Sequence, residues 1–154
     1  MTISAIGLDV GRKRIGVAGC DGTGLIAFGL MTISRRSFKD DVEQIRQLVH
    51  DRNVQTLVVG LPYLMDGSLG FQARQVQKFA NAIAAELQIP LVYVDERLTS
   101  FQAEQLLHAE GISPSRQKHL IDRKAAAIIL QQWLDEQRSQ GRIASSNSET
   151  LECI

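Results

Sequence analysis

The chain has 154 residues, of which 44% are hydrophobic and 22% charged, and its 17 basic and 17 acidic residues give a formal net charge of zero. This length fits one compact domain with a hydrophobic core and leaves no room for a second full domain. The balanced charge excludes the strong overall positive charge that marks many nucleic-acid-binding proteins, so an anionic partner would have to be bound by a local basic patch.

Three segments typical of β-strands open the chain, at residues 3–10, 14–20 and 25–33. Short stretches rich in Gly, Asp, Arg and Lys separate them. Because connections of this length form hairpins, we expect the three strands to be antiparallel neighbours.

The pattern then alternates between helix and strand. Apolar residues recur at helical spacing over residues 38–52, and residues 56–60 form a short, fully apolar run typical of a buried strand. A second helical pattern runs through residues 76–87, and residues 91–94 form the last strand. Because a helix that crosses over to a buried strand implies parallel pairing, the last two strands should be parallel.

Helices are predicted to follow the last strand. A third helical pattern covers residues 99–111, residues 113–114 resemble a helix cap, and a long amphipathic helix spans about residues 120–137. Beyond a single domain of residues 1–138, residues 139–154 are rich in Ser and Asn without periodicity, which indicates a flexible tail. We therefore predict an α/β fold with a mixed five-stranded sheet, three strands antiparallel and two parallel, and helices on both faces.

Three acidic residues occupy comparable places: Asp9 inside the first strand, Glu96 just past the last strand and Asp122 near the start of the long helix. An unpaired carboxylate in a buried strand is costly unless it takes up a proton or finds a compensating charge. If the first and last strands run parallel side by side, Asp9 and Glu96 share the sheet edge at which open α/β folds bind ligands. Asp122 lies on the inward face of its helix, because apolar residues follow it four, seven and eleven positions later.

Each acid also has a simpler explanation: a strand-end turn with Gly11 for Asp9, a surface ion pair with Arg97 for Glu96, and a favourable helix N-terminal charge for Asp122. Together, however, three carboxylates repel one another and raise each other's pKa unless cations are present. Mg²⁺ and Mn²⁺ prefer such hard oxygen ligands. The conjunction predicts a divalent-metal site in which the three acids are both metal ligands and catalytic residues for phosphodiester hydrolysis.

Basic residues cluster near the same elements despite the zero net charge. A polyanionic backbone would be held by such a rim, although solvated turns carry similar charges. The guanidinium of Arg97 is expected either to hold Glu96 or to bind a phosphate oxygen. The predicted nucleic-acid contacts are Arg12, Lys13, Arg14, Ser68, Arg97, Lys118, Arg123 and Lys124.

Ser68 belongs to this set because it lies in a loop before a helix, where its hydroxyl and amide could be presented to phosphate. An ordinary helix cap would look the same. Aromatic residues make up only 5% of the chain, which argues against recognition by base stacking. We expect the shape and the backbone of a nucleic acid to be recognised in preference to its sequence.

Several motifs together resemble one known family. They are residues 6–11, 14–18, 59–62, 66–68, 94–100, 121–122 and 125–130. In order and content they are similar to the RuvX (YqgF) family of bacterial pre-16S rRNA nucleases, which have also been described as Holliday junction resolvases. The resemblance implies an RNase H-like fold with Asp9, Glu96 and Asp122 in the metal-binding catalytic positions. Arg123 and Lys124 are more basic than the small or apolar residues expected after that aspartate.

The expected activity is that of a metal-dependent endonuclease using Mg²⁺ or Mn²⁺, acting in ribosome biogenesis on the 5′ end of pre-16S rRNA. A Holliday junction resolvase in DNA recombination and repair, and a non-catalytic ribosome-assembly factor that binds nucleic acid, remain alternatives. An actin-like phosphotransferase would need two domains, which this length does not allow. Expected partners are precursor ribosomal RNA or branched DNA. No apolar run approaches the ~20 residues that span a bilayer, and the two cysteines show no disulfide framework, as expected in a reducing cytosol. We therefore expect a cytoplasmic protein without membrane contact. We also expect it to be a monomer or a weak homodimer.

Overall fold

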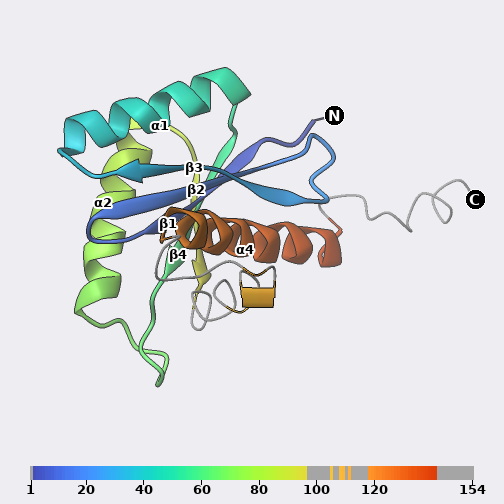
Figure 1. Ribbon diagram of the computed structural model, residues 1–154. Helices are drawn as coiled ribbons and strands as arrows, with labels where there is room; N and C mark the ends of the chain where they lie inside the picture. Colours follow the sequence, from blue (N-terminus) through green and yellow to red (C-terminus); the bar gives the residue numbers. More distant parts are fainter. Residues whose placement is uncertain (1, 97–104, 106–107, 110, 112–117, 142–154) are drawn as a thin grey trace, which may run out of the picture.

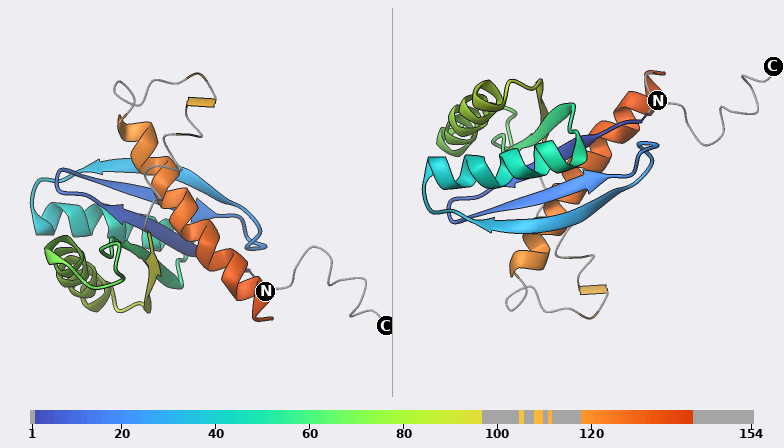
Figure 2. Two further views of the ribbon diagram at one scale, coloured as in Figure 1. Left: turned by 90° about the horizontal axis from the view of Figure 1, so that it is seen from below. Right: turned by 90° about the horizontal axis from the view of Figure 1, so that it is seen from above.

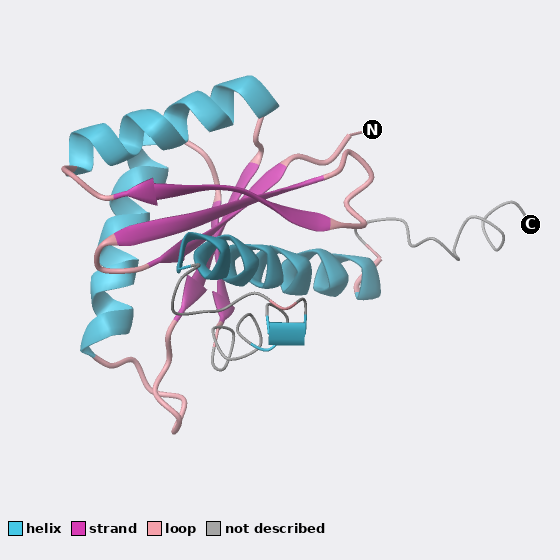
Figure 3. Cartoon of the chain, viewed as in Figure 1, coloured by secondary structure: helices cyan, strands magenta, loops and turns pink. Residues whose placement is uncertain are grey.

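The computed structural model describes residues 2–96, 105, 108–109, 111 and 118–141. Within these residues, five strands form one sheet that carries helices on both faces (Figures 1 and 3). The elements are β1 (Ala5–Val10), β2 (Arg14–Cys20), β3 (Ala27–Ser34), α1 (Phe38–Arg52), β4 (Thr56–Leu61), α2 (Phe71–Leu87), β5 (Leu91–Asp95) and α4 (Lys118–Ser139). None of these helices is long and apolar enough to cross a membrane.

The strand order is β3-β2-β1-β4-β5. β1 pairs antiparallel with β2, and β2 pairs antiparallel with β3. On the other side of β1, β4 and then β5 are added in parallel. This order confirms the predicted mixed sheet. The expectation that the first and last strands lie side by side was wrong, because β4 lies between β1 and β5.

Most element boundaries agree with the sequence pattern. β2 and α1 match the predicted ranges, and β4 and β5 each extend one residue further. β3 begins at Ala27 and not at residue 25, because the Asp21 carboxylate accepts hydrogen bonds from the backbone amides of Leu25 and Ile26, both at 2.9 Å. The predicted cap at 113–114 and most of the predicted helix over 99–111 lie outside the described residues, as does the tail beyond residue 141.

The two faces of the sheet carry different cores. On one face, Ile6, Leu8 and Val10 of β1 join a cluster with buried residues of α1 and α2. On the other face, Ala5 joins a smaller cluster with α4. Figure 2 shows α4 crossing the strands diagonally on its own side, with α1 and α2 together on the opposite side. Because side chains alternate along a strand, Asp9 belongs to the α4 face.

The α4 helix lies very close to the sheet. Four strands each place a glycine beneath it: Gly7, Gly16, Gly29 and Gly60. A Cβ atom at Gly7, for example, would lie 2.8 Å from the Cβ atom of Leu130. The missing side chains therefore let the helix backbone settle on the strands, and this sets the position of the helix's first turn over the sheet edge.

Candidate active site

Asp9 and Asp122 are brought together by the pairing of β1 with β2. Asp9 lies near the end of β1, is partly buried, and has Gly16 of β2 as its cross-strand partner. A Cβ atom at Gly16 would overlap the backbone of Asp122, so only glycine leaves room for the first turn of α4 there. The first turn of α4, which carries Asp122, therefore lies over Gly16, directly beside Asp9.

Glu96 reaches the same place from the far edge of the sheet. It follows β5 directly, and its backbone N–H donates to the carbonyl oxygen of Leu61 at 3.2 Å. A Cβ atom at Gly60 in β4 would lie 2.6 Å from Oε2 of Glu96, so the carboxyl group lies over this glycine. The bare backbone of Gly60 lets Glu96 extend across β4, where its side chain forms a hydrogen bond with Asp9.

The two hydrogen-bonded carboxyl groups, Asp9 and Glu96, both have a raised pKa. Burial, together with the negative charge of Asp9 and the hydrogen bond to it, raises the pKa of Glu96 to about 9. Burial also raises the pKa of Asp9, to about 6, although the hydrogen bond from Glu96 lowers it. At neutral pH, therefore, a protonated Glu96 donates a hydrogen bond to an ionised Asp9. A proton here occupies the position that a cation would fill between two anions.

Asp122 is partly buried and paired with a cation. Nε of Arg14 donates to Oδ2 of Asp122 at 2.6 Å, in an ion pair between β2 and α4. The charge of Asp122 also raises the pKa of Asp9, which places the two carboxylates within electrostatic reach of each other. The sequence pattern predicts a basic rim that includes Arg14, and in the structure Arg14 lies beside Asp122. Arg14 and Gly16 are two residues apart in β2, so both lie on the α4 face of the sheet. This spacing could have indicated that Arg14 lies close to Asp122.

The carboxylates are a suitable donor set for a divalent ion, although they are not arranged as ligands here. Among the described residues, no group of three or more His, Cys, Asp or Glu side chains has a metal-binding arrangement. Instead, Glu96 is bonded to Asp9, and Asp122 to Arg14. Three hard oxygen donors at one sheet edge, two of them with a raised pKa, are a site that a divalent cation would stabilise by replacing the proton between Asp9 and Glu96.

The predicted basic contacts fall into two groups. Arg12 and Lys13 are exposed in the turn between β1 and β2, directly after Asp9, and Lys118 is exposed at the start of α4. Arg123 packs its side chain against Gly29, and its Nε donates to the carbonyl oxygen of His119 at 3.3 Å. The first group faces solvent beside the acids, whereas Arg123 is partly engaged in packing.

The remaining predicted contacts are placed differently. Both the hydroxyl and the amide of Ser68 donate to Oδ1 of Asp66, at 2.6 and 2.9 Å, so they close a turn. The N-cap of α2 is Gly70, and the phosphate contact expected of Ser68 stays a prediction. Lys124 is partly buried in α4. Arg97 lies outside the described residues.

Comparisons with known proteins show the family to which the chain is similar. The family RuvX, described as "Holliday junction resolvase", matches residues 3–136. A protein of Trichormus variabilis named "Putative pre-16S rRNA nuclease" is 70% identical over 140 residues, which cover 91% of this chain and 93% of that protein. One of the same name from Synechococcus elongatus is 61% identical over 143 residues, covering 93% and 96%.

Similarity to solved structures supports the fold. The RuvC protein of T. thermophilus, determined in complex with a Holliday junction substrate, superposes with a TM-score of 0.58 at 17% identity, covering 92% of this chain and 98% of that one. The shared architecture is the RNase H-like fold that the sequence motifs imply.

Proposed function

Because this chain belongs to the RuvX family, we propose that it is a metal-dependent endonuclease that cleaves phosphodiester bonds of pre-16S rRNA. The observation that carries this proposal is the convergence of Asp9, Glu96 and Asp122 from β1, from the end of β5 and from α4. The substrate follows from the names of relatives that are 61% and 70% identical. Processing of the 5′ end in the cytoplasm is the corresponding place in ribosome maturation.

The three carboxylates would hold Mg²⁺ or Mn²⁺. A bound ion supplies Lewis-acid chemistry, which activates water and stabilises the leaving oxygen of a phosphodiester. The chain's own residues prepare the site. Glu96 would give up to solvent water the proton of its hydrogen bond with Asp9, and the ion pair with Arg14 holds the Asp122 carboxylate at the sheet edge. Because Asp9 is in a central strand and Asp122 in a helix packed onto it, the donors are held on rigid elements.

Nucleic acid would be bound mainly through its backbone. Arg12 and Lys13 follow Asp9 by three and four positions in an exposed turn, where their charges can bind phosphates next to the scissile bond. Lys118 adds an exposed charge at the start of α4. Contacts of this kind position the substrate and carry no sequence information directly.

Cleavage of a four-way DNA junction is the second candidate function. It is favoured by the description of the RuvX family as Holliday junction resolvase. Both activities would use the same three acids, because hydrolysis of RNA and DNA backbones poses the same problem of charge stabilisation.

The test compares both substrates side by side. Purified protein with Mg²⁺ or Mn²⁺ should cleave precursor 16S rRNA, and Asp9→Asn should reduce cleavage to background while the circular dichroism spectrum stays native. Asp51→Asn is the matched control, because Asp51 is an exposed residue of α1 that accepts a hydrogen bond from Gln47. Cleavage of the junction alone would favour the resolvase function, and cleavage that persists in Asp9→Asn would overturn the proposed active site.

A further inference from the structure

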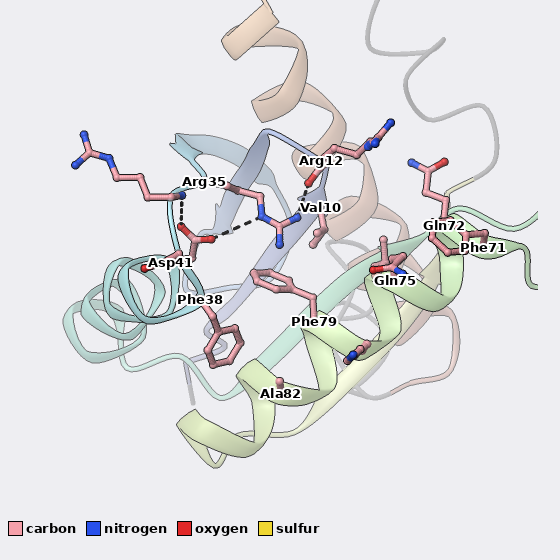
Figure 4. Close-up of a pocket in the computed structure, with 15 residues that line it drawn as sticks. Val10, Arg12, Arg35, Phe38, Asp41, Phe71, Gln72, Gln75, Phe79 and Ala82 are labelled. Atoms are coloured by element: carbon pink, nitrogen blue, oxygen red, sulfur yellow. Dashed lines mark hydrogen bonds and ion pairs between the residues drawn. The ribbon is translucent and has the colours of Figure 1, made fainter.

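A second surface lies on the opposite face of the sheet from Asp122. It is a groove of about 960 Å³ between the start of α1 and the side of α2, and its wall includes Val10, Gly11 and Arg12 (Figure 4). Three of the chain's five phenylalanines line it: Phe38, Phe71 and Phe79. The low aromatic content of the chain argues against base stacking. The fold, however, concentrates most of the phenylalanines in one place.

The three rings are presented in different ways. Phe79 is held in the groove wall, with the guanidinium carbon of Arg35 at 4.3 Å from its ring centroid and the Phe38 ring at 6.0 Å, edge to face. Phe71, the first residue of α2, is 80% exposed, and Phe38 is 44% exposed. Large exposed aromatic side chains gathered beside a groove are typical of a surface that binds a partner. Two ring faces are therefore available here to an incoming flat group.

The charges that face this groove are positive. Asp41, the acidic residue in its lining, is 2% exposed, and its Oδ2 lies 3.6 Å from Nε of Arg35. Nη1 of Arg35 donates to the carbonyl oxygen of Gly11 at 2.7 Å. The other charged lining residues are the exposed cations Arg12, Arg36 and Lys78. Within the described part of the chain, none of these three cations has an ion-pair partner. A partner of complementary charge is a polyanion.

The groove is continuous with the active site along the chain. Asp9 points to the α4 face, and the next residue, Val10, lines the groove on the other face. Gly11 and Arg12 then form the turn that joins the two surfaces around the sheet edge. A strand bound at Asp9 would therefore pass Arg12 before reaching Phe71. Only an unpaired strand offers base faces for stacking, because the bases of a duplex are stacked on one another.

We infer that this groove binds a single-stranded stretch of nucleic acid, with bases stacked on Phe71 and Phe38 and phosphates held by Arg12, Arg36 and Lys78. The assignment of this strand as the flank of the cleaved substrate rests on the proposed function. Binding itself requires no cleavage, so the two can be tested separately.

The first experiment measures stacking without divalent ions. A single-stranded RNA that contains 2-aminopurine is titrated with the full chain, and fluorescence quenching reports stacking of that base. Phe71→Leu should weaken binding by about 5- to 150-fold, the range for loss of one aromatic stacking partner, whereas Phe71→Tyr should keep both affinity and quenching. Ile26→Ala is the control, because Ile26 is 62% exposed in the turn at the opposite end of β2.

The second experiment measures the charge contribution. Lys78→Gln should lower the slope of log affinity against log salt by about 0.7 for a single strand, as expected for one lost phosphate contact. Unchanged single-strand affinity in Phe71→Leu would overturn the inference. The inference would also be overturned if Phe71→Leu lost self-association or binding to another protein and kept its affinity for the single strand. If wild type quenches the probe but cleaves neither RNA nor DNA, the groove stands and the proposed function fails. If wild type cleaves but Phe71→Leu still quenches the probe like wild type, the proposed function is supported and the groove assignment fails.

Discussion

The proton shared by Asp9 and Glu96 is the chemical feature that distinguishes the site at the scale of single residues. Burial raises the pKa of both carboxyl groups, and the negative charge of Asp9 contributes to the raised pKa of Glu96. Such carboxylates give up solvation on folding without gaining a cation in return. The metal-free site is therefore a local destabilising element, which a divalent ion would relieve.

This arrangement predicts how the stability of the metal-free protein depends on pH. The folded pKa values of about 6 and about 9 lie above the ordinary values of 3.8 and 4.5, so the folded state binds more protons than the unfolded state between these limits. Their contribution to stability is fully present below about pH 4 and is lost as pH rises to 6 and then to 9. Urea unfolding in EDTA at several pH values should show this decline relative to Glu96→Gln. Parallel curves for the two proteins would contradict it.

A second prediction concerns the exposed turn residues Arg12 and Lys13. Arg14 is left out because it is paired with Asp122 and would disturb the acids if removed. Changing Arg12 and Lys13 together to Gln should lower the slope of log affinity against log salt by about 1.8 on a duplex, or about 1.4 on a single strand, since two phosphate contacts are lost. Stabilisation by Mg²⁺ should stay as in wild type. An unchanged slope would place the substrate elsewhere.

At the scale of elements, the packing of α4 on the sheet is what positions the site. Gly16 admits the backbone of Asp122, and Gly60 admits the carboxyl group of Glu96. Neither glycine contributes a functional group. Each nevertheless decides whether an acid reaches Asp9, because a single methyl group at either position would occupy the space that the acid's backbone or side chain takes up.

Gly16→Ala tests this role. The added Cβ would meet the Asp122 backbone, which cannot swing aside as a side chain can, so α4 must move away. We expect a loss of about 1–3 kcal/mol in unfolding free energy, typical of overpacking, together with weaker cleavage. The control is Gly22→Ala, whose Cβ would meet only Cγ2 of Thr2 at 3.7 Å. Denaturant unfolding of both variants gives the comparison, and equal stabilities would show that the helix is not held where the structure places it.

At the scale of the whole molecule, the site exists only in the folded chain. Asp9, Glu96 and Asp122 come from three elements separated by long stretches of sequence. Because the unfolded chain does not assemble them, a divalent ion that binds these acids would bind the native state selectively and stabilise it by mass action. The family's assignment as nucleases can therefore be examined without any nucleic acid.

The measurement is a thermal melt with increasing Mg²⁺. At about ten times the dissociation constant the gain is roughly 1.4 kcal/mol, which corresponds to a rise of about 3 to 6 °C in melting temperature for a domain of this size. Ca²⁺ should also raise it, since it accepts the same oxygen ligands. Asp9→Asn, Glu96→Gln and Asp122→Asn should each reduce the rise. A rise that survives all three changes would place the metal elsewhere.

The sequence by itself determined the local elements and the mixed sheet, and it predicted the three candidate acids. Apolar periodicity and the placement of glycines act over a few residues, so β2 and α1 could be predicted to their ends. Asp9 and Asp122 were identifiable because a carboxylate on an otherwise apolar face requires compensation.

Only the tertiary structure decided how these parts meet. β4 separates the strands that lead to Asp9 and Glu96, and Glu96 reaches Asp9 because Gly60 leaves the intervening strand bare. The pairing of Arg14 with Asp122 and the grouping of Phe71 with Phe79 likewise join residues from different elements. The physical reason is that these contacts depend on strand order and on the close packing of whole elements, which no local pattern of residues encodes.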